Sequence, residues 1–176
     1  MQKFLRMTAL AATATAIAFA ATPAAAAPVG PSDRNATATA RIVKPLTLNW
    51  VQDLNLGTIL LSGAGAWNGA VVAIARDGTF SCTNTNVVCS GTTQVARYRV
   101  TGTNRQQVTI TAPNVTLTNA NNALQTLTMA VDSPGTVTLP NSGNTGIEFP
   151  LGGSITVDST TGDGVYSGSF NVTVDY

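Results

Sequence analysis

The chain has 176 residues, of which only 10% are charged, and its formal net charge at pH 7 is +1. It contains no histidine, which excludes Ser-His-Asp and Cys-His catalytic arrangements and removes the commonest metal ligand. The near-neutral charge and the lack of a basic patch argue against nucleic acid or an anionic lipid surface as a partner.

The first 26 residues have the pattern of a secretory signal peptide. Lys3 and Arg6 precede an apolar run over residues 7–21, and small residues end the segment at Ala26. A membrane anchor is the alternative, but the run is short and rich in alanine for a bilayer span. We therefore expect an exported chain that has no membrane span after cleavage and keeps about 150 residues, enough for one domain with its own core.

A short segment with strand periodicity follows the signal peptide. Residues 27–35 are polar and contain glycine and proline, which predicts a flexible linker. Residues 36–43, ATATARIV, alternate with period two and predict an extended segment. One face of this segment carries Ala36, Ala38, Ala40 and Ile42. A strand on a flexible tether can pair with its own sheet or with the sheet of a neighbouring chain.

The rest of the chain is a series of short alternating runs. These runs are separated by glycine, asparagine, aspartate and proline, with tight turns expected at Asn68-Gly69 and Asp77-Gly78. About ten short strands with regular turn signals predict an all-β fold, an immunoglobulin-like antiparallel β-sandwich. We expect residues 36–176 to form a single domain, either complete in itself or completed by a donor strand.

Cys82 and Cys89 are the two cysteines of the chain. Export implies an oxidising compartment, so we expect them to form a disulfide, which closes a loop of about eight residues. Their spacing excludes a CxxC redox pair, and the absence of histidine and of further cysteines argues against a metal site.

The end of the chain has the cleanest strand pattern. From residue 166 to residue 176 every second residue is apolar, apart from Gly168, and the residues between them are polar. This alternation predicts one strand that buries one face and runs to the last residue. Its apolar face consists of Tyr166, Phe170, Val172, Val174 and Tyr176.

The sequence offers little chemistry. The eight acidic residues are scattered and form no recognisable catalytic or EF-hand motif, so we expect no enzyme activity, no cofactor and no metal. The loop over residues 158–164, DSTTGDG, is typical of a plain turn. Trp67 lies in the Gly/Ala-rich stretch GAGAWNGA and is the candidate for a ligand contact. Trp50 alternates with Leu46 and Leu48 and is expected in the core.

Three motifs carry a resemblance to a known family. In chain order they are ATATARIVKPLTLN from Ala36, LNLGTI from Leu54 and GVYSGSFNVTVDY from Gly164. Together they resemble the bacterial family called domain of unknown function 4402, and the resemblance covers most of the chain after the signal peptide. That family is similar to pilus subunits of the chaperone–usher type and to spore-coat-U-like secreted proteins.

The similarity to pilus subunits implies an incomplete immunoglobulin-like sandwich. Its missing strand would come first from a periplasmic chaperone and then from the N-terminal extension of the next subunit. Residues 36–43 would be the donor strand, and the apolar face of residues 166–176 would line the acceptor groove. An outer-membrane usher and a final place in a fimbria or surface coat are also implied. Alanines stand in the donor segment where larger apolar residues are usual.

Two functions follow as hypotheses. In the first, the chain is a structural surface subunit that assembles with copies of itself or with related subunits by donor-strand exchange. In the second, residues 36–43 fold back into their own domain, and the chain is a monomeric secreted or periplasmic module that binds a glycan or surface ligand through Trp67 and nearby loops. The small apolar content of residues 36–43 keeps the second hypothesis open.

Overall fold

A computed structural model describes residue 30 and residues 36–63, 65–141 and 145–176. The chain divides into two units, residues 1–40 and residues 41–176. The predicted signal peptide, residues 1–26, and all of the predicted linker except Gly30 lie outside the described residues. In the first unit, residues 36–40 are exposed and belong to no strand.

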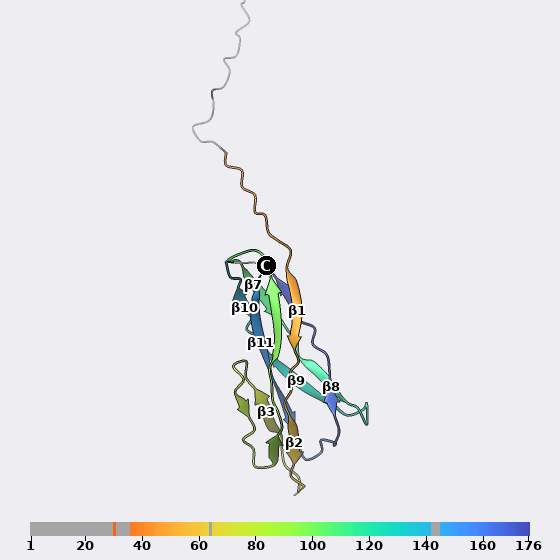
Figure 1. Ribbon diagram of the computed structural model, residues 1–176. Coiled ribbons are helices and arrows are strands. Elements are labelled where there is room, and N and C mark those ends of the chain that lie inside the picture. The colour runs from red at the N-terminus through yellow and green to blue at the C-terminus, as the bar shows by residue number, and fades with distance from the viewer. Residues whose placement is uncertain (1–29, 31–35, 64, 142–144) are drawn as a thin grey trace, which may run out of the picture. The chain divides into compact units, whose positions relative to one another are not determined.

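The described part of the second unit consists of strands and turns, without a helix (Figure 1). The strands are β1 (Thr47–Gln52), β2 (Thr58–Leu61), β3 (Ala70–Ile74), β4 (Phe80–Ser81), β5 (Val87–Ser90), β6 (Ala96–Thr101), β7 (Gln107–Thr111), β8 (Val115–Asn119), β9 (Thr126–Asp132), β10 (Thr136–Thr138), β11 (Ile147–Val157), β12 (Tyr166–Ser167) and β13 (Thr173–Asp175). Their periodicity is that of half-buried strands, as in β7, where Val108 and Ile110 are buried and their neighbours are exposed.

The strands form three antiparallel sheets. The largest follows the order β1-β6-β11-β9-β8-β12, with β3 on β11 and β4 on β3. The second sheet is β10-β7-β13, and the third is β2-β5. The layers pack as a sandwich, which confirms the predicted all-β antiparallel fold.

The long strand β11 serves both halves of the sandwich. Residues 147–151 pair with β6, whereas residues 152–157 pair with β9 and β3. The change of partner falls at Gly152 and Gly153, which are both buried. A Cβ atom on Gly152 would lie 2.4 Å from the carbonyl oxygen of Ile74, so β3 approaches β11 at a point where only glycine fits.

Two hydrophobic cores lie along β11. The first core lies mainly between the β3–β11–β9–β8 layer and the β2-β5 sheet, and its buried members are Leu56, Ala70, Val72, Ile74, Val87, Val95, Val115, Leu117, Met129, Ile155 and Val157. The second core lies between β6 with the start of β11 and the β10-β7-β13 sheet, and its buried members are Ala96, Val100, Val108, Ile110, Leu139, Phe149 and Leu151.

Asn119 is the buried polar side chain among the described residues, with 1% of its surface exposed. Its Nδ2 donates to Gln125 Oε1 and to the Asp163 carbonyl, both at 2.8 Å, and its Oδ1 accepts from the Asn121 amide at 2.9 Å. These bonds satisfy both ends of the side-chain amide and join the end of β8 to two loops.

Asn119→Ala is expected to lower the free energy of unfolding by about 2–4 kcal/mol, because it leaves buried partners without their hydrogen bonds. Asn121→Ala removes an exposed side chain from the same loop and is the control, with an expected change within about 0.5 kcal/mol. Urea unfolding followed by circular dichroism measures both changes. Equal losses in the two variants would contradict this assignment.

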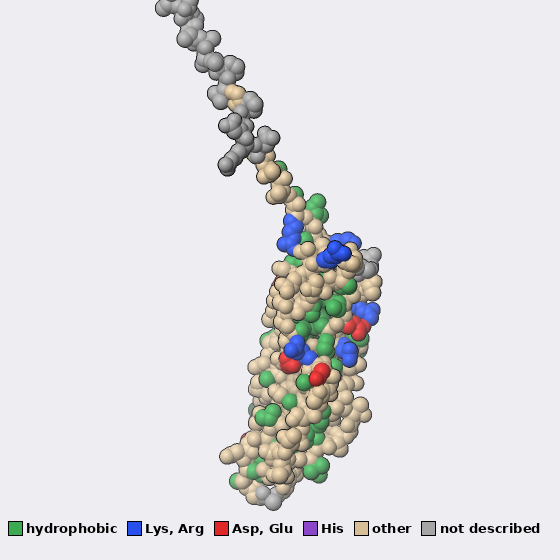
Figure 2. All heavy atoms as spheres, turned by 90° about the vertical axis from the view of Figure 1, so that its left-hand side faces the viewer, with side chains coloured by type: hydrophobic (Ala, Val, Ile, Leu, Met, Phe, Trp, Pro, Cys, Tyr) green, Lys and Arg blue, Asp and Glu red, His purple; other side chains and the backbone are tan. Residues whose placement is uncertain are grey.

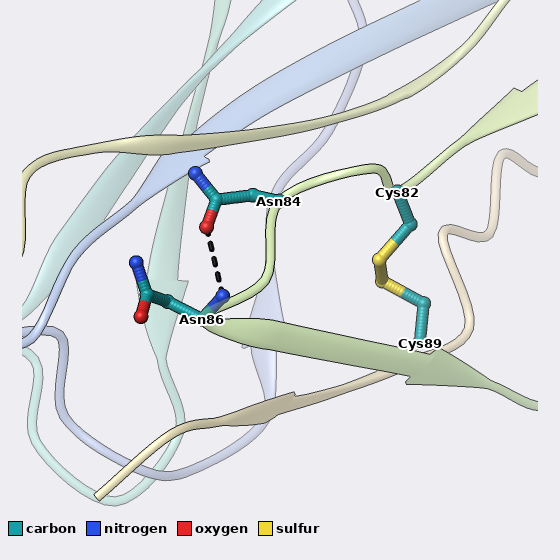
Figure 3. The surroundings of a disulfide bond; sticks show 4 residues. All are labelled: Cys82, Asn84, Asn86 and Cys89. Atoms are coloured by element: carbon teal, nitrogen blue, oxygen red, sulfur yellow. Dashed lines mark hydrogen bonds between the residues drawn. A yellow bond between two sulfur atoms is a disulfide. The ribbon is translucent and has the colours of Figure 1, made fainter. Parts of the chain in front are cut away.

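Cys82 and Cys89 form a disulfide, with their Cα atoms 6.3 Å apart (Figure 3). Both side chains pack against the first core. Inside the loop that they close, the Asn86 amide donates to Asn84 Oδ1 at 2.8 Å. The bond links the segment after β4 to β5, which no ladder joins to β4 among the described strands.

Replacing both cysteines by alanine is expected to lower the free energy of unfolding by about 2.5 kcal/mol, the loop-closure entropy of so short a loop. Thermal unfolding of the variant and of the parent chain, each with and without a reductant, measures this effect. A reductant should destabilise the parent chain alone. A variant as stable as the oxidised parent would show that the crosslink contributes nothing.

The structure corrects one predicted strand. Residues 166–176 were expected to form one continuous strand, but they form β12, which pairs with β8, and β13, which pairs with β7. Between them, a Cβ on Gly168 would lie 2.5 Å from the Thr116 carbonyl oxygen. The chain crosses from one sheet to another at this close contact, so no single ladder accommodates the whole segment.

Candidate functional site

β1 and β13 are edge strands beside the second core. Among the described strands, β1 pairs only with β6, and β13 pairs only with β7. Each therefore presents one side of its backbone without a strand partner, the arrangement that a further strand can complete. In Figure 1, β1 begins near the end of the second unit where the chain terminates.

The side chains of β1 that face the second core are incompletely covered. Trp50 stands opposite Tyr98, which stands opposite Phe149, and directly opposed residues share one face of a sheet. Phe149 is 1% exposed, so all three side chains face the core. Trp50 is nevertheless 61% exposed, because no strand among the described residues covers this edge. The prediction that Trp50 is buried was therefore wrong.

The C-terminal segment presents a matching apolar row. Val172 and Val174 are half-buried against the second core, and Val174 stands opposite Ile110 of β7. Phe170 packs against both cores. We call the region between this row and β1 the open side, and its lining residues are Leu46, Leu48, Trp50, Phe170, Val172 and Val174.

The two edges are tied together where the chain ends. The Tyr176 hydroxyl accepts a hydrogen bond from the Thr103 amide at 2.8 Å and donates to the Lys44 carbonyl. The Lys44 amide donates to Thr103 Oγ1 at 2.6 Å. The last residue of the chain thus anchors the residues that precede β1, and the open side is narrow at this end.

Trp50 of the open side and the two aromatic residues beside it in the cross-strand row are held in place. Trp50 Nε1 donates to Asp53 Oδ1 at 3.0 Å, and the Tyr98 ring stacks on Phe149 with centroids 6.0 Å apart. Partial burial raises the pKa of Tyr98, and the charge of Asp53 adds to this effect. Tyr98 is therefore neutral at physiological pH, which suits a site for an apolar strand face.

The other predicted groove residue, Tyr166, lies farther along the same row. It belongs to β12, packs against the first core and donates from its hydroxyl to the Gly162 carbonyl at 2.9 Å. The predicted apolar face of residues 166–176 therefore borders the first core at Tyr166, both cores at Phe170, and the second core at Val172 and Val174.

The predicted donor segment divides between the two units. Ala36, Ala38 and Ala40 belong to the first unit, and Ile42 belongs to the second, where it is 90% exposed. None of residues 36–43 belongs to a strand, so the structure shows no pairing of this segment with its own sheet.

Trp67 is half-buried rather than fully exposed. It packs against the first core, its indole donates to the Ser62 carbonyl at 3.4 Å, and its amide donates to Ser159 Oγ at 3.3 Å. It borders a shallow depression of about 370 Å³, and Asp158 and Thr160 line both this depression and another of about 300 Å³. Sequence pattern placed Trp67 at the surface but did not reveal these contacts.

The loop after β11 is a turn that is held by hydrogen bonds to the carboxylate of Asp158, a residue of the same loop. Asp158 Oδ1 accepts from the hydroxyl and the amide of Thr160, at 2.7 and 2.8 Å, and these bonds lower the pKa of Asp158. In the described ranges, no group of three or more His, Cys, Asp or Glu side chains is placed to hold a metal ion. The same residues contain no helix of the length and hydropathy that a membrane span requires.

Sequence reasoning missed the open side in β1 and at the residue just before it. Leu46, Leu48 and Trp50 were assigned to an ordinary core strand, whereas they border the open side. No signal in the sequence marked this edge, because alternation specifies which side chains face inward and not which strands lie beside a strand.

The fold and the site define a class: an antiparallel β-sandwich domain with an open side between two edge strands. The chain belongs to the family described as "Domain of unknown function (DUF4402)", whose family model matches residues 46–176. This match confirms the family resemblance found in the sequence motifs. Neither the curated proteins nor the solved structures contain a match to the chain.

Proposed function

We propose that the chain is a structural subunit of the bacterial surface that assembles with copies of itself, or with related subunits, when residues 36–43 of one copy fill the open side of another. The observation that carries this proposal is Trp50, which faces the core from an edge strand and is still 61% exposed. An inward-facing ring without a cover indicates that a layer of the sandwich is missing at that point.

The proposed donor, residues 36–43, and the edges of the open side both lack a strand partner among the described residues. The unpaired edges of β1 and β13 expose backbone donors and acceptors, and the apolar row between them is partly wet. An added strand would form backbone hydrogen bonds, each contributing about 0.5–1.5 kcal/mol, and would cover that row. Residues 36–43 alternate in period two, are exposed and belong to no strand, so they are available to pair.

The surface of the second unit also favours close packing of copies. On the face drawn in Figure 2, a few charged side chains stand among uncharged ones, and hydrophobic side chains emerge between them. Such a surface produces little like-charge repulsion between copies. In this proposal the chain is exported through the periplasm, where a chaperone covers the open side before an usher or the next subunit replaces it. Its role is structural and not catalytic.

A second candidate function rests on Trp67. The depression that it borders combines an aromatic side chain with the polar groups of Asp158, Ser159 and Thr160, a combination that suits a sugar ring. In this alternative, the chain is a monomeric secreted or periplasmic module that binds a glycan or surface ligand. The first candidate function has the stronger support of the two. The depressions are shallow, and the Asp158 carboxylate already accepts hydrogen bonds within its own turn.

Size exclusion and thermal melting of two chains test the proposal, one of residues 27–176 and one lacking residues 27–43. We expect the longer chain to form oligomers, and the shorter chain to melt at least about 5 °C lower until a peptide of residues 35–44 restores it. A longer chain that stays monomeric at every concentration, with one sharp melt, would overturn the proposal. A glycan screen with Trp67→Ala would then follow.

A further inference from the structure

Two aromatic side chains border the open side, and Trp50 is the more exposed of them, with 61% of its surface accessible. Trp50 comes from β1 and Phe170 from the opposite row, where it touches both cores. A hydrogen bond to Asp53 fixes the Trp50 indole, and the stacked pair of Tyr98 and Phe149 stands beside it in the same cross-strand row. A strand added at the open side would lie against Trp50 and Phe170, so these rings limit the room for its side chains.

The apolar face of the N-terminal segment carries mainly small side chains. At three successive positions of its apolar face the side chain is a single methyl group, in Ala36, Ala38 and Ala40. Its bulky apolar residues, Ile42 and Val43, come only at the end next to Lys44, which is anchored by Thr103 and Tyr176. Large residues in the acceptor with small residues in the donor fill the same total volume as small residues in the acceptor with large residues in the donor.

We propose, as a refinement that rests on the proposed function, that the aromatic rings of the open side select a donor strand by size: residues 36–40 of a second copy are accepted because alanines fit against Trp50 and Phe170, and a strand with large apolar residues at these positions is excluded. Trp50 is the selecting residue, because it is the exposed ring of the row. In this proposal the open side requires small side chains in the donor segment, and alanines therefore stand where larger apolar residues are usual.

Size selection makes a prediction opposite to that of simple hydrophobic burial. Burial alone predicts that leucine at position 36, 38 or 40 strengthens assembly, because leucine buries more apolar surface than alanine. Size selection predicts weaker assembly, since extra methylenes in a filled space typically destabilise packing. Residues 36–40 lie outside the compact second unit, so these substitutions leave its fold unchanged.

The experiment uses residues 27–176, the chain without its predicted signal peptide, and light scattering to measure the concentration at which half of it is assembled. Ala36→Leu, Ala38→Leu and Ala40→Leu are made one at a time, and we expect at least one of them to raise this concentration about tenfold or more. Thr39→Leu adds the same side chain on the opposite face and should change it less than threefold or so. Adding Trp50→Ala to the impaired variant should restore assembly, because it opens space for the leucine.

The outcomes separate the two proposals. A parent chain that never assembles overturns the proposed function and this refinement with it. A parent chain that assembles, with all three leucine variants assembling as well or better, overturns size selection and leaves the proposed function standing. An impaired leucine variant that Trp50→Ala does not rescue shows that Trp50 is not the selecting residue.

Discussion

Gly152→Ala is expected to lower the free energy of unfolding by about 3 kcal/mol or more, the upper range for an added group in a packed interior. The new methyl group would lie 2.4 Å from the Ile74 carbonyl oxygen and 3.0 Å from backbone atoms of Ala75 and Arg76. Backbone cannot move aside as a side chain can, so β3 would have to separate from β11. Urea unfolding followed by circular dichroism measures the loss.

The adjacent glycine is a matched control. A methyl group on Gly153 would meet Met129 Sδ at 3.1 Å and Leu54 Cδ1 at 3.2 Å, which are the ends of flexible side chains. Gly153→Ala is therefore expected to cost about 1 kcal/mol or less, although both glycines are buried. If Gly153→Ala proved the more harmful of the two, the close approach of β3 to β11 at Gly152 would be refuted.

Phe149→Ala is expected to lower the free energy of unfolding by about 3–5 kcal/mol. Phe149 is among the largest of the fully buried side chains in the described residues, and its ring stacks on Tyr98 in the middle of the second core. Its removal leaves a cavity that the chain cannot collapse to fill, because the backbone of Phe149 is held in the ladder with β6. Denaturant unfolding of the purified chain measures the loss.

Trp50→Ala removes a larger ring from the same cross-strand row. In the separate subunit, this change should cost below about 1 kcal/mol, because 61% of Trp50 is already exposed. The contrast between the two aromatic substitutions therefore reports directly on the open side. A Trp50→Ala loss as large as that of Phe149→Ala, measured at concentrations where the chain is monomeric, would mean that the ring is covered within its own domain.

Alternation in the sequence was enough to predict the class of fold. Period two in segments such as residues 107–111 specifies which side chains face inward, and the turn residues between the segments separate the strands. Most of the apolar face of the C-terminal segment was also predicted: Phe170, Val172 and Val174 are half-buried and the residues between them are exposed, whereas Tyr176 is 42% exposed. These properties depend on local sequence, and local sequence was available.

The errors concern partners, which local pattern does not specify. Tyr166 and Val174 belong to one unbroken alternation, yet they lie in strands of different sheets, because the crossing at Gly168 depends on the position of Thr116 in β8. Trp50 was correctly assigned to the inward face, but its exposure depends on whether a neighbouring strand is present. Alternation indicates the direction of a side chain and gives no information about what covers it.

The pairing of β1 with β6 has a consequence for how the chain would bear tension. β1 begins three residues after Lys44, so tension on the N-terminal segment is passed into β1, and its component parallel to the strand acts along the ladder with β6. Its pairs with β6 run from Thr47 and Thr101 to Gln52 and Arg97, and their hydrogen bonds lie across the direction of pull. The bonds are then loaded together in shear rather than opened one after another, and the strand resists as a unit.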